Sequence, residues 1–191
     1  KNILVKIRKV VEKDIPRLIN IHLNSLSEDV MSVIGKRILD KYYSSILKDK
    51  SNYIFGIYYE KHLVSFCCIA RSTINIIEIF DVFIISSFFK LFFSKPKIIF
   101  SAIIQFLNHH KLENSLEISF IATDVNFQSK GFGRMLINHI NEYFGKMKID
   151  YLITKTSNDR LKRFYIENYN AKTYRTFKIF DKKYYYLRWW I

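Results

Sequence analysis

The chain is poor in the residues that divide or staple a protein. Its 191 residues include only 2 prolines, 5 glycines and 2 cysteines. We find no linker-like tract, repeat or low-complexity stretch, so we expect one domain spanning residues 1–191. Cys67 and Cys68 are neighbours in an apolar strand, where alternation sends them to opposite faces, so they form neither a disulfide framework nor a metal site.

Acidic residues are also few, with 17 Asp and Glu against 31 Lys and Arg and a formal net charge of +14. Such an excess suits nucleic acid, an acidic membrane or small anionic ligands. The basic residues are spread along the chain without an RNP-like motif or zinc-finger spacing, so nucleic acid is not an expected partner. Residues 1–11 do not have a signal-peptide pattern, and we expect a reducing, cytoplasmic location.

Two apolar stretches, Ile74–Phe93 and Ile98–Leu107, stand out near the middle of the chain. The first is interrupted by charged residues, and the second is shorter than the roughly 18 apolar residues of a spanning helix. We expect a helical insert at about 74–108 that lies over the sheet, walls a pocket or makes a homodimer. A peripheral membrane contact stays open, because lysines accompany the apolar residues. The interrupting and accompanying residues are Glu78, Asp81, Lys90, Lys95 and Lys97.

Period-two alternation and helical spacing give the other elements. Expected strands are 3–9, 53–60, 63–71, 117–123, 151–156, 172–180 and 183–190, and expected helices are 12–26, 36–48, 134–146 and 158–168. Short connections at 61–62 and 181–182 are typical of hairpins. Strands separated by helices predict an α/β (α+β) fold with a mixed, twisted sheet of about seven strands flanked by helices.

The most informative segment is a strand that runs into a glycine-containing turn and a helix. Gln128 to Gly133 has the spacing Q-x-x-G-x-G, and neither Gly131 nor Gly133 has a Cβ that would hold a ligand off the backbone. Lys130 and Arg134 add positive charge to a helix terminus that is already positive. This combination predicts a site for a phosphate, bound by backbone amides and both cations.

Two familiar phosphate-binding loops do not fit this segment. The chain has no G-x-x-x-x-G-K-[ST] sequence, and the turn lacks the first glycine of a dinucleotide fingerprint. The alternative interpretation is a surface loop in which two glycines and two basic residues occur together without a ligand.

In sequence order, these elements resemble the GNAT superfamily of acyl-CoA-dependent N-acetyltransferases. The family signature is a strand, [QR]-x-x-G-x-[GA], a helix and a later Asn-plus-Tyr motif, which here are Gln128 to Gly133, Asn158 and Phe164-Tyr165. The resemblance covers nearly the whole chain. The chain departs from the family at Leu161, where a small residue is frequent, and at Tyr169-Asn170, where Gly-Phe is frequent.

The resemblance implies acetyl-CoA as cosubstrate and no metal. It places the pantetheine arm along the backbone of the strand that precedes the turn, at Ile121 to Thr123, where the family opens this strand from its neighbour. The amide near Ile121 would polarise the thioester carbonyl. Asn158 either caps its helix or binds the arm. The expected cofactor-binding residues are Ile121, Ala122, Thr123, Gln128, Ser129, Lys130, Gly131, Phe132, Gly133, Arg134 and Asn158.

Two catalytic residues follow from position in the family pattern. Glu117, on the strand before the turn, resembles the general base of the histone-acetylating branch, and Tyr165 resembles the proton donor to the departing thiolate. The alternatives are a glutamate on an exposed strand face and a tyrosine that only packs. Other candidate bases, acting through water, are Glu78, Asp81 and Glu113.

The acceptor is expected to be a small, anionic amine, because the net positive charge of the protein repels polycations and attracts anions. A nucleotide-linked amino sugar fits this charge. An early Gly35 to Tyr43 element also resembles acetyltransferases found with polysaccharide biosynthesis. A protein or peptide amine, or an amino acid, remains open as the acceptor. So does a non-catalytic acyl-CoA-binding or membrane-surface module.

Overall fold

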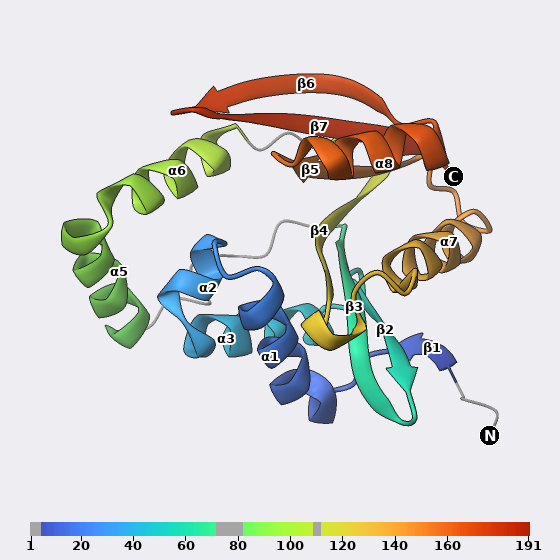
Figure 1. Ribbon diagram of the computed structural model, residues 1–191, viewed down its shortest axis with the longest axis horizontal. Helices are drawn as coiled ribbons and strands as arrows, with labels where there is room; N and C mark the ends of the chain where they lie inside the picture. Colours follow the sequence, from blue (N-terminus) through green and yellow to red (C-terminus); the bar gives the residue numbers. More distant parts are fainter. Residues whose placement is uncertain (1–4, 72–81, 109–111) are drawn as a thin grey trace.

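The structure is a computed structural model that describes residues 5–71, 82–108 and 112–191. Seven strands form one mixed sheet in the order β1-β2-β3-β4-β5-β7-β6 (Figure 1). All neighbouring strands are antiparallel except β4 and β5, which are parallel. The predicted fold class is confirmed. The strands are β1 (Val5–Lys9), β2 (Tyr53–Tyr59), β3 (His62–Ala70), β4 (Ser115–Thr123), β5 (Tyr151–Thr156), β6 (Lys172–Ile179) and β7 (Lys182–Trp190).

Helices cover both faces of the sheet. They are α1 (Ile15–Ser25), α2 (Val30–Ile34), α3 (Lys36–Lys48), α5 (Val82–Ser94), α6 (Pro96–Leu107), α7 (Phe132–Phe144) and α8 (Asp159–Tyr169), with 3₁₀ turns η1 (Glu12–Asp14) and η2 (Val125–Phe127). The helix at 36–48 and the strand at 151–156 have the predicted bounds. Helix α2 was not predicted, since five residues are too few for a periodic pattern; the Asp29 side chain caps it by accepting a bond from the Met31 amide at 2.9 Å.

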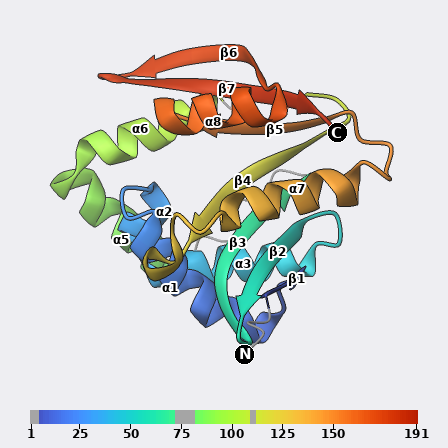
Figure 2. The same cartoon turned by 45° about the vertical axis from the view of Figure 1, so that its right-hand side comes forward.

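Two hydrophobic cores lie on opposite faces of the sheet. One packs α1 and α3 against the first strands, and the other packs α7 and α8 against the centre and the far strands. We call the face of the sheet that packs against α3 the α3 face, and the opposite one the α7 face. Figures 1 and 2 show the sheet between these two groups of helices. Cys67 belongs to the α7 face and Cys68 to the α3 face, and both are free and buried, which confirms the predicted alternation.

Parallel pairing between β4 and β5 stops halfway along β4. The last paired residues are Ile118 and Thr154, although β4 continues to Thr123 and β5 to Thr156. Figure 2 shows β4 turning away from β5. A register shift against β3 leaves Ser119 as an extra residue at the same point, and such bulges bend a strand. The two strands therefore form a fork, which begins after Ile118 and Thr154; there β4 stays paired with β3 but has no strand partner on its β5 side.

The insert is a helical hairpin, α5–α6, rather than a cover for the sheet. The helices pack against each other and against α2. Helix α6 also reaches the β6–β7 hairpin, where the Gln105 amide donates to the Tyr184 hydroxyl at 3.5 Å and the Tyr186 hydroxyl donates to the Asn108 carbonyl at 3.0 Å. The predicted residues 74–81 lie outside the described residues. Within the described part, no helix is long and apolar enough to cross a membrane.

The path into the last hairpin depends on Asn170. Its φ of 52° is left-handed, and its amide N–H closes the end of α8 on the Tyr165 carbonyl. Glycine is the usual residue at this position, and asparagine is the common substitute. Although Tyr169-Asn170 departs from the family pattern, Asn170 ends α8 in the conformation that glycine would adopt. Strand β6 begins two residues later.

Candidate active site

The glycine turn forms an open cradle at the start of α7. Gly131 caps this helix with a φ of 81°, and a Cβ built on Gly131 or Gly133 would meet no protein atom within 4 Å. Ser129 also has a positive φ, 62°. The first-turn amides of α7 face this space without partners inside their own helix, and Lys130 and Arg134 are exposed beside it. The geometry matches a phosphate group in contact with backbone amides.

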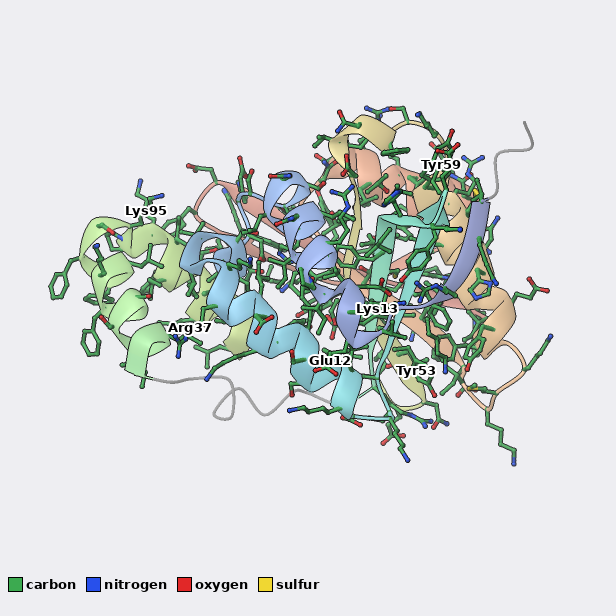
Figure 3. The ribbon with its side chains drawn as sticks, turned by 90° about the horizontal axis from the view of Figure 1, so that it is seen from below. Glu12, Lys13, Arg37, Tyr53, Tyr59 and Lys95 are labelled. Atoms are coloured by element: carbon green, nitrogen blue, oxygen red, sulfur yellow. The ribbon has the colours of Figure 1, made fainter. Side chains whose placement is uncertain are left out.

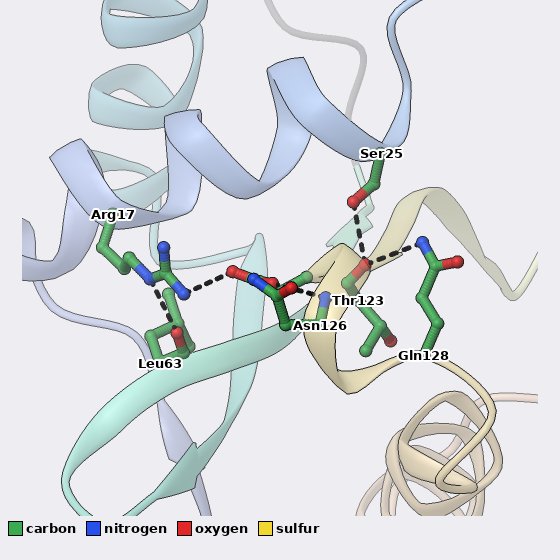
Figure 4. Close-up of polar contacts among 7 residues, drawn as sticks. Arg17, Ser25, Leu63, Thr123, Asn126 and Gln128 are labelled. Atoms are coloured by element: carbon green, nitrogen blue, oxygen red, sulfur yellow. Dashed lines mark hydrogen bonds and ion pairs between the residues drawn. The ribbon is translucent and has the colours of Figure 1, made fainter.

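A polar network fixes the turn between β4 and the cradle (Figure 4). The Thr123 carbonyl accepts hydrogen bonds from the Ser25 hydroxyl at 2.8 Å and from the Gln128 amide at 3.2 Å. Arg17 forms an ion pair with the nearly buried Asp124 carboxylate, which also accepts a bond from the Asn126 amide at 2.9 Å. The Gln128 side chain thus points back to β4 and holds the turn, so its expected contact with the cofactor would come from its backbone.

Asn158 is the N-cap of α8. Its Oδ1 accepts bonds from the amides of Arg160 at 2.9 Å and Leu161 at 3.1 Å. Of the two predicted roles, the structure shows the capping one. A pocket of about 360 Å³ lies between the start of α7 and one side of α8, and it is lined by Arg134, Arg160, Arg163, Phe164, Glu167 and Asn168. Three guanidinium groups there provide further sites for phosphate oxygens.

Tyr165 reaches the α7 face of the fork from α8. The side chain is fully buried against Trp189, with ring centroids 5.1 Å apart. Its hydroxyl has no hydrogen-bond partner in the described part of the chain. Burial raises the pKa of this hydroxyl, whereas the nearby Thr154 side chain acts to lower it. Because Thr154 donates to the Ile118 carbonyl at 3.1 Å, the Tyr165 hydroxyl lies at the point where β4 and β5 part.

Glu117 lies on the α3 face of β4, next to the fork. Burial, followed by the Cys68 side chain, raises the pKa of Tyr42, and the Glu117 carboxylate adds to the shift. Burial and the neighbouring Tyr186 raise the pKa of Tyr174, again with a contribution from Glu117. Glu117 is half-buried, and its carboxylate lies near enough to the hydroxyls of Tyr42 on α3 and Tyr174 on β6 to influence their pKa values. The role of Glu117 as the general base stays a prediction.

Lys155 is a second charged group at this point, on β5 just past the last β4–β5 pair. Burial lowers the pKa of its ammonium group, while the Glu117 and Asp29 carboxylates act against the shift. Sequence reasoning missed Lys155, Tyr42 and Tyr174, although a lysine inside the apolar strand 151–156 was a readable signal. Their convergence depends on the packing of α3, β5 and β6, which no local pattern specifies.

Of the alternative bases, Glu113 lies away from the fork. It lines a pocket with Arg71 and Asn114 before the first residue of β4. Glu78 and Asp81 lie outside the described residues. Among the residues that are described, no group of three or more His, Cys, Asp or Glu side chains could hold a metal ion.

His22 is fully buried on the α3 face, among packed aromatic side chains. Its Nδ1 lies 2.6 Å from the Tyr43 hydroxyl, and its ring packs edge-on against Phe120 at 4.8 Å. It joins α1 and α3 behind the fork, which makes it part of the support for β4 rather than of the open site.

The chain was compared with known families and structures. Residues 98–168 match the model of the Acetyltransferase (GNAT) family. No curated protein sequence matches the chain. Solved structures of the same fold include the ribosomal-protein-S18-alanine N-acetyltransferase from Escherichia coli, with 12% identity, a TM-score of 0.60, and coverage of 98% of this chain and 94% of that one.

Two further structures extend the comparison. PaiA N-acetyltransferase from Thermoplasma acidophilum, in complex with coenzyme A, has 11% identity and a TM-score of 0.60 over 98% of this chain and 99% of that one. A spermidine N-acetyltransferase chimera from Vibrio cholerae SpeG and hSSAT has 15% identity and a TM-score of 0.63 over 97% and 94%. The chain therefore has the fold of these N-acetyltransferases, and its residues 98–168, from α6 to α8, match the GNAT family model.

Proposed function

We propose that the protein transfers an acetyl group directly from acetyl-CoA to a primary amine, and that the acceptor is an anionic amine such as a nucleotide-linked amino sugar. The observation that supports this most strongly is the Tyr165 hydroxyl, buried at the fork with no partner among the described residues. A buried donor without a partner is costly, and a substrate atom that binds at the fork would satisfy it.

On the cofactor side, the cradle would bind the pyrophosphate through the amides of residues 129–134, with Lys130 and Arg134 as counter-charges. The pantetheine arm would then run along Ile121, Ala122 and Thr123 on the edge of β4 that β5 does not pair with, in the place of a missing strand. The arginine pocket beside Phe164 has room for the remaining phosphate. The sulfur would arrive next to the Tyr165 hydroxyl.

At the reacting centre, the acceptor amine must lose a proton before it attacks the thioester carbonyl. Glu117 would accept that proton, directly or through water, from the α3 face of the fork. A backbone amide of β4 near Ile121 would stabilise the oxyanion. When the C–S bond breaks, the Tyr165 hydroxyl, which carries its proton at neutral pH, would donate a hydrogen bond or that proton to the thiolate.

The acceptor side of the fork is basic and aromatic. Cross-strand pairing puts Lys155 opposite Tyr186 and Ile153 opposite Arg188, and opposite residues share a face of the sheet. The Arg188 guanidinium lies 5.2 Å from the centroid of the Tyr151 ring. Cations next to flat rings suit a phosphorylated sugar or nucleotide better than a polyamine. This surface supports the anionic acceptor over a polycation such as that of the spermidine enzyme.

The test is acceptor-dependent release of free CoA from acetyl-CoA. We expect thiol release with amino-sugar nucleotides, and a rate that falls as salt rises, because screening weakens the attraction between a +14 protein and an anion. Peptides, amino acids and polyamines complete the panel. A clear preference for a polyamine would overturn the acceptor class, and a lack of release with every amine would overturn direct transfer.

The cradle itself can be tested without an acceptor. Replacing Gly133 with valine should weaken acetyl-CoA binding about 100-fold, because the side chain would fill the space left for the phosphate. Calorimetry measures the effect. The melting temperature of Gly133→Val is the control and should match that of wild type, because a Cβ at Gly133 meets no protein atom within 4 Å. Equal affinity in Gly133→Val and wild type would contradict the cradle.

A further inference from the structure

The α5–α6 hairpin exposes an unusual amount of apolar surface. Phe93 is 81% exposed, Leu107 73% and Phe89 65%. Single exposed apolar residues are ordinary, but a contiguous apolar patch on a monomer marks an interaction site. Half of the exposed large apolar side chains of the described chain belong to these two helices: Ile85, Phe89, Phe92, Phe93, Phe100, Ile103 and Leu107.

Packing inside the protein accounts for only a small part of this hairpin. Ile84 and Ile99 are its buried apolar anchors, and Asn108, just after α6, accepts a bond from Arg175 at 3.3 Å. The Phe100 ring lies 6.3 Å from the Phe180 ring between β6 and β7, whereas Phe89, Phe92 and Phe93 are exposed. Figure 3 shows Lys95 at the outer turn of the hairpin and rings that project away from the sheet.

The positive charge of the α5–α6 hairpin indicates what kind of partner its apolar surface fits. Residues 82–107 contain three lysines, Lys90, Lys95 and Lys97, and no acidic residue. All three lysines are exposed, and they lie beside or within one turn of the apolar patch. A second copy of this protein would bring the same positive surface and a net charge of +14 against it, which disfavours a symmetric dimer. An anionic lipid surface offers both an apolar phase and opposite charge.

We propose that the α5–α6 hairpin is a membrane-docking element that inserts its phenylalanine side chains at the interface of an anionic bilayer, with its lysines among the headgroups. Each lysine near an anionic surface adds attraction, and long lysine side chains can reach the headgroups while the rings lie deeper. The helices are too short to span the bilayer, so they would lie in its interface. This proposal is independent of the acetyl-transfer function.

The hairpin would hold the enzyme in a defined orientation. Because α6 is tied to the β6–β7 hairpin through Tyr184 and Tyr186, docking would place that end of the sheet close to the lipid surface. The cradle lies at the start of α7, on a different element, and stays accessible to a water-soluble nucleotide (Figure 1).

Vesicle co-sedimentation tests the proposal with wild-type protein, using phosphatidylcholine vesicles with and without phosphatidylglycerol. We expect binding to the anionic vesicles only, weakened by salt. Lys95→Glu/Lys97→Glu should weaken binding about tenfold or more. Lys146→Glu/Lys148→Glu is the matched control, because these exposed lysines flank a turn after α7, and it should bind nearly as wild type does. Equal losses in the two double variants would overturn the specific site in favour of general charge attraction.

Insertion is tested separately from charge. In a Trp190→Phe background, Phe93→Trp adds a reporter, while Trp189 is buried and insensitive. We expect a blue shift and quenching by brominated lipids when anionic vesicles are added. Phe92→Ser/Phe93→Ser should abolish binding at an unchanged melting temperature, since both rings are exposed. No quenching, or a dimer in sedimentation equilibrium that is lost in Phe92→Ser/Phe93→Ser, would overturn the membrane as the occupant.

Discussion

Tyr165→Phe should slow acetyl transfer about 100-fold, within the range typical of general acid–base groups. Acetyl-CoA affinity should stay within about twofold of wild type, because the ring keeps its packing on Trp189 and only the hydroxyl is lost. The measurements are kcat from thiol release and Kd from calorimetry. A variant with unchanged kcat on a working acceptor would return Tyr165 to a packing role.

Stability gives this prediction a second readout. A buried hydroxyl that lacks a partner in the described structure is destabilising, so its removal should leave the melting temperature unchanged or raised. A purely structural tyrosine would behave in the opposite way and lose stability. Tyr169→Phe is the matched control from the same helix, since the Tyr169 hydroxyl donates to the Asn138 side chain at 2.9 Å, and we expect it to keep its kcat.

Local patterns predicted the scaffold of this site well. The spacing of Gln128 to Gly133 correctly located a glycine turn that opens α7, because this spacing is a local feature of the sequence; phosphate binding at the turn stays a prediction. The helix at 36–48 and the strand at 151–156 were predicted to the residue, since each is bounded by a change of hydrophobic period. Only the family resemblance, and no pattern within the chain, indicated that β4 and β5 separate.

The acceptor side could not be predicted in the same way. Lys155, Tyr42 and Tyr174 come from three elements that are far apart in sequence, and they meet Glu117 only through sheet order and helix packing. The bulge at Ser119 decides this geometry, because it lets both Glu117 and Phe120 face α3 despite their odd spacing. Strict alternation along the predicted strand would have placed Phe120 on the α7 face.

The insert shows another limit of sequence reasoning. Its apolar run predicted helices correctly but not their position, because a helix that is apolar on most sides can face a core, a pocket or a membrane. The structure places the hairpin beside α2 and the β6–β7 hairpin and leaves Phe89 and Phe93 exposed. Only a fold can show which apolar side chains remain without a protein partner.

Glu117→Gln is expected to lower kcat/KM about 100-fold at a pH below the pKa of the acceptor amine, where nearly every acceptor molecule carries a proton that must be removed. As pH rises through that pKa, the amine becomes neutral in solution and the difference from wild type should narrow. The glutamine side chain keeps the size of glutamate but accepts no proton. The pH profile of kcat/KM is therefore the measurement, with Glu113→Gln as a control that should follow wild type.

Lys155 offers a second explanation for a loss of activity in Glu117→Gln, and the two explanations predict different kinetics. The Glu117 carboxylate counteracts the effect of burial on the pKa of Lys155, so glutamine at 117 should lower that pKa further and reduce the positive charge at the fork. A loss caused only by this change would appear mainly as a raised KM for an anionic acceptor, and Lys155→Met should reproduce it. A loss of proton acceptance lowers kcat on the acidic side instead. Parallel pH profiles for Glu117→Gln and wild type would exclude Glu117 as the base.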